Sequence, residues 1–161
     1  MSTRAILIVS LLGATADARR PPRLDKAEAA AQQVVEQWIT AMHFGSARPA
    51  ATSLTQTPFF SIAATDDATP CAETIAKTPA QLATSLACLH DHIAPRGTAK
   101  LWHRTLGGPL AAQLAHLSAL ARGAIIFELD EGCDGTSNQT LVVVKAKLVS
   151  AVLAQTATCT E

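Results

Sequence analysis

The stretch of residues 24–64 most constrains what this chain can fold into, because a helical pattern gives way within it to a strand-like one. Apolar residues recur at helical spacing over 26–43, which predicts an amphipathic helix that ends at Gly45. A shorter second helix follows up to about residue 54, and the run over 59–64 predicts the first strand. A helical segment that leads directly into sheet indicates an α+β fold.

The later patterns continue this mixture and end in strands. Residues 71–76 predict a short strand that pairs with the first one, and Thr78 with Gln81 predicts the capping box of a helix ending near Asp91. The next patterns predict a strand over residues 100–106 and a fourth helix over 110–121. Three C-terminal strands are predicted over 124–129, 140–144 and 148–153. We expect a tight turn over 145–147 between the last two strands.

The N-terminus indicates export. Arg4 precedes a short apolar run, and Ala16 and Ala18 form the small-x-small pattern that signal peptidase accepts, so we predict a signal peptide over residues 1–18. A mobile basic tail over 19–23 and a single α+β domain over 24–161 would follow. After cleavage no run is long enough to hold the chain in a membrane. The expected location is the periplasm or the outside of a bacterial cell.

Four cysteines, Cys71, Cys88, Cys133 and Cys159, lie in the predicted exported part. An even number in an oxidising compartment favours disulfides, with three connectivities open. We prefer Cys71–Cys88 and Cys133–Cys159, because each pair falls within one supersecondary unit. No two cysteines have the close spacing of a zinc site, so no metal is expected.

Composition and motifs argue against several functions. Lysine plus arginine and aspartate plus glutamate both number 13, which gives no basis for a strong attraction to nucleic acid or to an anionic membrane. The chain has no nucleophile elbow, phosphate-binding loop or dinucleotide fingerprint, and we therefore expect no cofactor. It also has no tyrosine, which removes every tyrosine acid, base or oxyanion donor.

The segment 38–45, followed by Leu54 and by Pro58, Phe59 and Phe60, resembles the nuclear transport factor 2-like, or ketosteroid-isomerase-like, superfamily. The resemblance lies in the order of elements. It implies a cone-shaped α+β fold, in which N-terminal helices pack on a strongly bent antiparallel sheet around a mostly apolar pocket. Members use this pocket for catalysis or for ligand binding, and the fold alone does not decide between them. The tyrosine donor of the isomerase-like enzymes has no counterpart here.

Large apolar side chains are the candidates for lining such a pocket, namely Trp38, Met42, Phe60, Trp102 and Phe127. The first hypothesis is therefore an exported, non-enzymatic module that binds a small apolar ligand or another protein chain. The same apolar faces could also form a homodimer interface.

Two alternatives remain. One is an isomerase, dehydratase or cyclase that uses His103 as a general base, oriented by Asp91 or Glu73, since proton transfer needs groups within hydrogen-bond reach. The other is a structural envelope protein to which the disulfides give durability.

Overall fold

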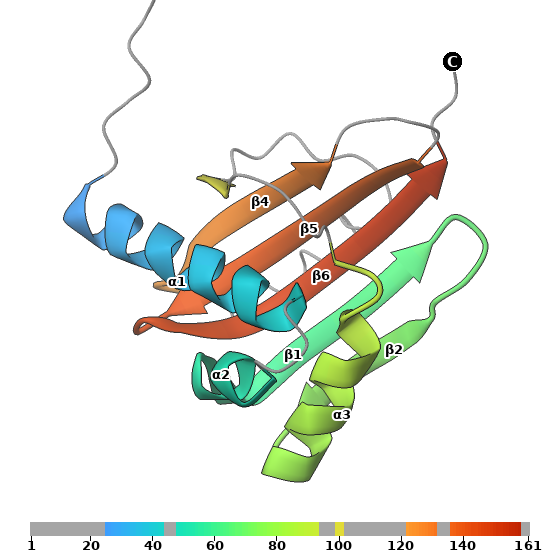
Figure 1. Cartoon of the computed structure of the whole chain (residues 1–161), viewed down its shortest axis with the longest axis horizontal. Coiled ribbons are helices and arrows are strands. Elements are labelled where there is room, and N and C mark those ends of the chain that lie inside the picture. Colours follow the sequence, from blue (N-terminus) through green and yellow to red (C-terminus); the bar gives the residue numbers. More distant parts are fainter. Residues whose placement is uncertain (1–24, 44–47, 94–98, 102–121, 132–135, 159–161) are drawn as a thin grey trace, which may run out of the picture.

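The structure is a computed structural model that describes residues 25–43, 48–93, 99–101, 122–131 and 136–158 (Figure 1). It is an α+β fold in which helices come first and strands dominate the C-terminal half, as predicted. The predicted helix over 110–121 lies outside the described residues. In chain order the elements are α1 Lys26–His43, α2 Arg48–Ser53, β1 Thr55–Thr65, β2 Cys71–Ala76, α3 Pro79–Leu89, β3 Lys100–Leu101, β4 Ile125–Glu131, β5 Thr136–Lys145 and β6 Leu148–Thr158.

The six strands form one sheet in the order β2-β1-β6-β5-β4-β3. Strand β1 runs parallel to β6, whereas the other neighbouring strands are antiparallel. The sheet is therefore mixed, and the prediction of a purely antiparallel sheet is wrong. Because β1 and β6 are far apart in the chain, no short turn forces them to run in opposite directions. The tight β5–β6 hairpin fixes the direction of β6 instead.

Helix α1 has the predicted bounds, and its first turn explains its start. The backbone N–H of Glu28 donates to Oδ1 of Asp25 at 2.8 Å, and the backbone N–H of Asp25 donates to Oε2 of Glu28 at 2.9 Å. These bonds satisfy amides that have no partner within the helix. The apolar stripe of α1 faces the sheet and buries Val35, Trp38 and Met42. No helix among the described residues is long and apolar enough to cross a membrane.

Helix α3 begins with the predicted capping box. The Thr78 hydroxyl accepts a hydrogen bond from the backbone N–H of Gln81, and the Gln81 side chain accepts one from the backbone N–H of Thr78. The last helical residue is Leu89, two residues before the predicted end. The helix lies over the β1–β2 pair at the edge of the sheet (Figure 1).

Strand β1 begins at Thr55, four residues before the prediction places it. Pro58 therefore lies inside the strand, where the register with β6 shifts between Thr55 and Phe60. Proline offers no N–H to a neighbouring strand, so a break in the ladder around it is expected. The Thr57–Pro58 peptide bond is cis.

A buried hydrogen-bond chain joins both N-terminal helices to β1. The indole Nε1–H of Trp38 donates to Oγ1 of Thr55 at 2.9 Å, and the Thr55 hydroxyl donates to the carbonyl oxygen of Ala51 at 2.7 Å. Both polar groups are thus satisfied away from water, which avoids the cost of an unpaired buried donor. The contact fixes the angle at which the chain leaves α2 and enters the sheet.

The two faces of the sheet carry separate apolar clusters. Phe59 and Val142 belong to the cluster that packs against the helices, whereas Phe60 and Val143 belong to a second cluster on the opposite face. Neighbouring residues of a strand point to opposite faces, so this alternation follows from strand geometry. Both faces of the central strands are buried.

The β5–β6 hairpin contains the turn predicted over 145–147. Ala146 and Lys147 both have positive φ angles, 49° and 65°. The left-handed region costs a residue with a β-carbon roughly 1–2 kcal/mol, and hairpins of this type favour Asn-Gly. The turn is therefore strained, and it lies near the start of α1.

Candidate functional site

A pocket of about 360 Å³ lies between α3 and the β1–β2 pair, on the helix-covered face of the sheet. We call it the serine pocket. Thr74 stands opposite Ser61 in the register of the two strands, and α3 forms the other wall. The residues that line it are Ser61, Cys71, Ala72, Thr74, Ala80, Gln81, Thr84, Ser85 and Cys88.

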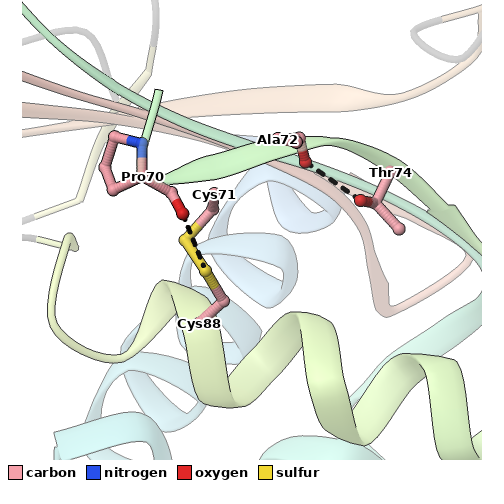
Figure 2. The surroundings of a disulfide bond; sticks show 5 residues. All are labelled: Pro70, Cys71, Ala72, Thr74 and Cys88. Atoms are coloured by element: carbon pink, nitrogen blue, oxygen red, sulfur yellow. Dashed lines mark hydrogen bonds between the residues drawn. A yellow bond between two sulfur atoms is a disulfide. The ribbon is translucent and has the colours of Figure 1, made fainter. Parts of the chain in front are cut away.

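A disulfide between Cys71 and Cys88 forms one wall of this pocket and ties β2 to α3 (Figure 2). The two Cα atoms are 5.9 Å apart, within the usual range for a disulfide. Sγ of Cys88 also lies 3.5 Å from the carbonyl oxygen of Pro70. The predicted Cys71–Cys88 pair is confirmed. Cys133 and Cys159 lie outside the described residues, so their pairing stays a prediction.

Two buried hydroxyls distinguish the serine pocket from ordinary packing space. Ser61 is 2% exposed and Ser85 is 6% exposed. Among the described residues, neither hydroxyl has a hydrogen-bond partner. A buried polar group without a partner costs about 1–3 kcal/mol, so such groups need an explanation.

The other hydroxyls that line the pocket are satisfied within the chain. The Thr74 hydroxyl donates to the carbonyl oxygen of Ala72 at 2.9 Å (Figure 2), and the Thr84 hydroxyl donates to that of Ala80 at 3.1 Å. The unused hydrogen-bonding capacity of the pocket therefore lies at the two buried hydroxyls, Ser61 and Ser85. A bound polar group would supply what they lack.

Of the described residues that line the serine pocket, none has a charged side chain. The amide oxygen of Gln81 already accepts hydrogen bonds from the backbone N–H groups of Lys77 and Thr78, at 2.8 and 3.2 Å. The rest of the wall consists of alanines, threonine methyl groups and the disulfide. The pocket therefore suits an uncharged molecule with a hydrogen-bonding group.

The predicted pocket-lining residues lie elsewhere. Trp38, Met42 and Phe127 are almost fully buried in the helix-side cluster, whereas Phe60 lies on the opposite face of the sheet. The structure thus brings three of them together and separates the fourth. None of them lines the serine pocket. Trp102 lies outside the described residues, and the role of the set in ligand binding stays a prediction.

The predicted acid–base group is only partly described. Glu73 is exposed on β2, and the Asp91 side chain is 79% exposed, with Oδ1 lying 2.8 Å from Nδ1 of His90. The ring of His90 lies 5.9 Å from that of His43. His103 lies outside the described residues, so the catalytic alternative stays a prediction. In the described part of the chain, no group of three or more His, Cys, Asp and Glu residues could hold a metal ion.

Ser61 and Ser85 were not predicted as site residues, although the sequence contains a signal for both. Ser85 interrupts the apolar stripe formed by Leu82, Leu86 and Leu89, and Ser61 interrupts the apolar run of β1. A polar residue on a face that must be buried needs a partner. The sequence could not indicate that α3 covers Ser61, because that depends on how the helix packs.

Comparisons with known proteins give likenesses in fold only. No protein-family model matches the chain, and no curated protein matches it significantly. An NTF2-like protein of unknown function from Cytophaga hutchinsonii aligns over 78% of this chain and 88% of its own, at 8% identity and a TM-score of 0.38. A designed protein with a curved β-sheet aligns over 79% and 84%, at 11% identity and a TM-score of 0.37.

A hypothetical protein with a ketosteroid-isomerase-like fold, from Catenulispora acidiphila, gives a similar alignment. It covers 76% of this chain and 83% of that one, at 11% identity and a TM-score of 0.38, and that protein was crystallised in complex with trimethylamine. Solved structures of the NTF2-like and ketosteroid-isomerase-like folds thus align with this chain. With TM-scores below 0.5, these alignments decide nothing about its ligand or activity.

Proposed function

We propose that this protein is a non-enzymatic binding module, and that it takes a small uncharged molecule into the serine pocket. The observation that carries the proposal is the pair of hydroxyls at Ser61 and Ser85, which are buried, face the pocket and have no partner among the described residues. A ligand oxygen could accept a hydrogen bond from either of them. The hydroxyls would then regain the hydrogen bonds that they lost on folding.

The size and walls of the pocket narrow the ligand class. Ligand pockets commonly measure about 300–1,000 Å³, and 360 Å³ lies at the small end of that range. Apolar walls with a few polar groups favour a compact molecule that carries one carbonyl or ether oxygen. A carboxylate or ammonium group would lose its hydration without meeting an opposite charge. We therefore infer a neutral ketone, ester, lactone or amide.

Export and domain organisation are part of the same proposal. Residues 1–18 would be removed as a signal peptide, and residues 19–23 would form a basic tail in front of one domain over 24–161. The disulfide between Cys71 and Cys88 supports this, because disulfides persist in oxidising compartments.

We also propose that the sheet is strongly bent, as the family resemblance implies. Register shifts interrupt three strand pairs, in β1–β2 between Ser61 and Ala63, in β1–β6 between Thr55 and Phe60, and in β5–β6 between Val143 and Val144. Extra residues in a ladder bend the strand that carries them, which supports the curvature. A bent sheet would hold α3 away from β1 and leave the space that forms the serine pocket.

Binding of cyclohexanone, γ-butyrolactone and 2-pyrrolidinone tests the proposal. Saturation-transfer NMR on the mature protein should detect at least one of them, and Ser61→Ala with Ser85→Ala should remove the signal. Ser53→Ala is the matched control, since this serine is exposed on α2 and its hydroxyl donates to the Ala50 carbonyl. Equal binding by both variants would refute the role of the two hydroxyls.

A further inference from the structure

A second pocket, of about 260 Å³, lies where the start of α1 meets β4 and the β5–β6 hairpin. We call it the lysine pocket. Its walls are almost entirely aliphatic and include Ala27, Ala31, Ile125 and Val144. Among the lining residues that the structure describes, Lys147 alone has a polar side chain. The pocket thus combines an apolar interior with one positive charge, and it shares no residue with the serine pocket.

Further positive charges flank this pocket. Lys26, Arg122 and Lys145 each stand next to a lining residue in the chain, and all three side chains are exposed, as is that of Lys147. Within the described part of the chain, none of these four side chains forms an ion pair. This end of the molecule therefore offers positive charge without a fixed counter-ion.

Carboxylates at the start of α1 lie beside this pocket and offset part of its positive charge. Those of Asp25 and Glu28 accept hydrogen bonds from backbone N–H groups in the first turn of α1. Capping explains their place at the helix start, where they already interact with the positive end of the α1 dipole and keep their negative charges. The four cations around the pocket outnumber these two carboxylates, so positive charge remains in excess.

The hairpin turn brings Lys147 to this pocket. Ala146 and Lys147 adopt left-handed conformations that asparagine and glycine adopt more easily. Both residues line the pocket. An Ala-Lys turn keeps a methyl group and an ammonium group at the pocket, which an Asn-Gly turn would not.

We propose that the lysine pocket binds a small carboxylate with an aliphatic tail, such as a short-chain fatty acid anion. The tail would lie against Ala27, Ala31 and Ile125, and the carboxylate would pair with Lys147 at the mouth. Charge complementarity selects the anion, and the aliphatic walls select an unbranched chain over a compact polar ion such as phosphate. This ligand class differs from the neutral one proposed for the serine pocket.

Calorimetric titration with hexanoate tests the proposal on the full mature protein. The Lys147→Gln variant should bind hexanoate about three- to tenfold more weakly, since an exposed ion pair contributes modestly. Lys77→Gln is the matched control, because this exposed lysine precedes α3 and is not among the residues that line either pocket; the affinity of this variant should stay within about twofold of the wild type. Equal losses in the two variants, or no measurable binding to the wild type, would overturn the proposal.

Two further measurements distinguish specific binding of hexanoate from nonspecific hydrophobic adsorption. The neutral analogue 1-hexanol should bind more weakly than hexanoate, and equal affinity would remove the role of charge. Replacing the turn by Asn-Gly, with Ala146→Asn and Lys147→Gly, should raise the melting temperature by about 3 °C while weakening hexanoate binding as Lys147→Gln does. A turn variant that binds hexanoate as tightly as the wild type would also overturn the proposal. Because this variant is expected to be more stable than the wild type, misfolding would not explain a loss of binding.

Discussion

The serine pocket and the lysine pocket lie on the same helix-covered side of the sheet, at opposite ends of the strand order. In the described part of the chain, the first pocket holds two buried hydroxyls without partners and no charged side chain, whereas the second holds an exposed lysine beside aliphatic walls. The difference comes from what covers each end. Helix α3 brings small polar residues over β1 and β2, and the first turns of α1 bring alanines over β4 and β5.

This comparison teaches that buried and exposed polar groups carry different information about ligands. An unpartnered hydroxyl in the interior has a free-energy cost that a ligand can relieve, so it points to a hydrogen-bonding group. An exposed lysine without a partner costs little free energy, so it indicates only that a ligand would carry a negative charge.

Removal of the disulfide should have the largest effect. Changing Cys71 and Cys88 to serine frees a loop with a sequence separation of 17 residues, and a loop of this size is worth about 3 kcal/mol of unfolding free energy. Urea denaturation should show this loss, and the wild type under reducing conditions should show at least the same loss, since reduction would also open the predicted Cys133–Cys159 bond. The serine pocket should also stop binding neutral probes, because α3 would no longer be tied to β2. A loss below about 1 kcal/mol would contradict this.

The Thr55→Val change should lower the free energy of unfolding by about 2 kcal/mol. The Thr55 hydroxyl accepts from the Trp38 indole, so valine leaves this buried N–H without its partner, whereas the Ala51 carbonyl keeps the hydrogen bond from the backbone N–H of Leu54. Chemical denaturation measures the change, and the near-isosteric shape of valine keeps packing effects small. An unchanged free energy of unfolding would mean that a buried hydroxyl with hydrogen-bond partners contributes no more to stability than one without them.

The Asn-Gly turn variant should be more stable than the wild type by about 1 kcal/mol, because it relieves the left-handed strain at Ala146 and Lys147. Urea denaturation compares the two proteins directly. The single change Ala146→Asn provides the control, and it should give part of the gain while keeping the lysine. A destabilised variant would show that the turn is not strained.

Ser85→Ala should have the smallest effect on stability, and its sign is the informative part. Because the hydroxyl has no partner among the described residues, its removal should leave stability unchanged or raise it by up to about 1 kcal/mol. Thermal melting of the ligand-free protein checks the sign. A clear loss of stability, like that expected for Thr55→Val, would mean that Ser85 holds the fold together and is not reserved for a ligand.

Local patterns in the sequence predicted much of this fold. The bounds of α1, the capping box of α3 and the pairing of Cys71 with Cys88 were all predicted, because each depends on residues close together in the chain. The parallel pairing of β1 with β6 was missed, since it joins strands that are distant in sequence and lack a connecting turn. Ser61 and Ser85 were missed for the same reason, as they meet only when α3 packs on β1.

The most direct test of the central claim is a thermal and binding comparison of the wild type with the Ser61→Ala, Ser85→Ala double variant. The account predicts that the double variant melts at the same or a higher temperature without ligand, and that it no longer responds to the neutral probe that stabilises the wild type. A double variant that melts clearly lower, or that still binds the probe as tightly, would contradict the claim that these two hydroxyls form a ligand site.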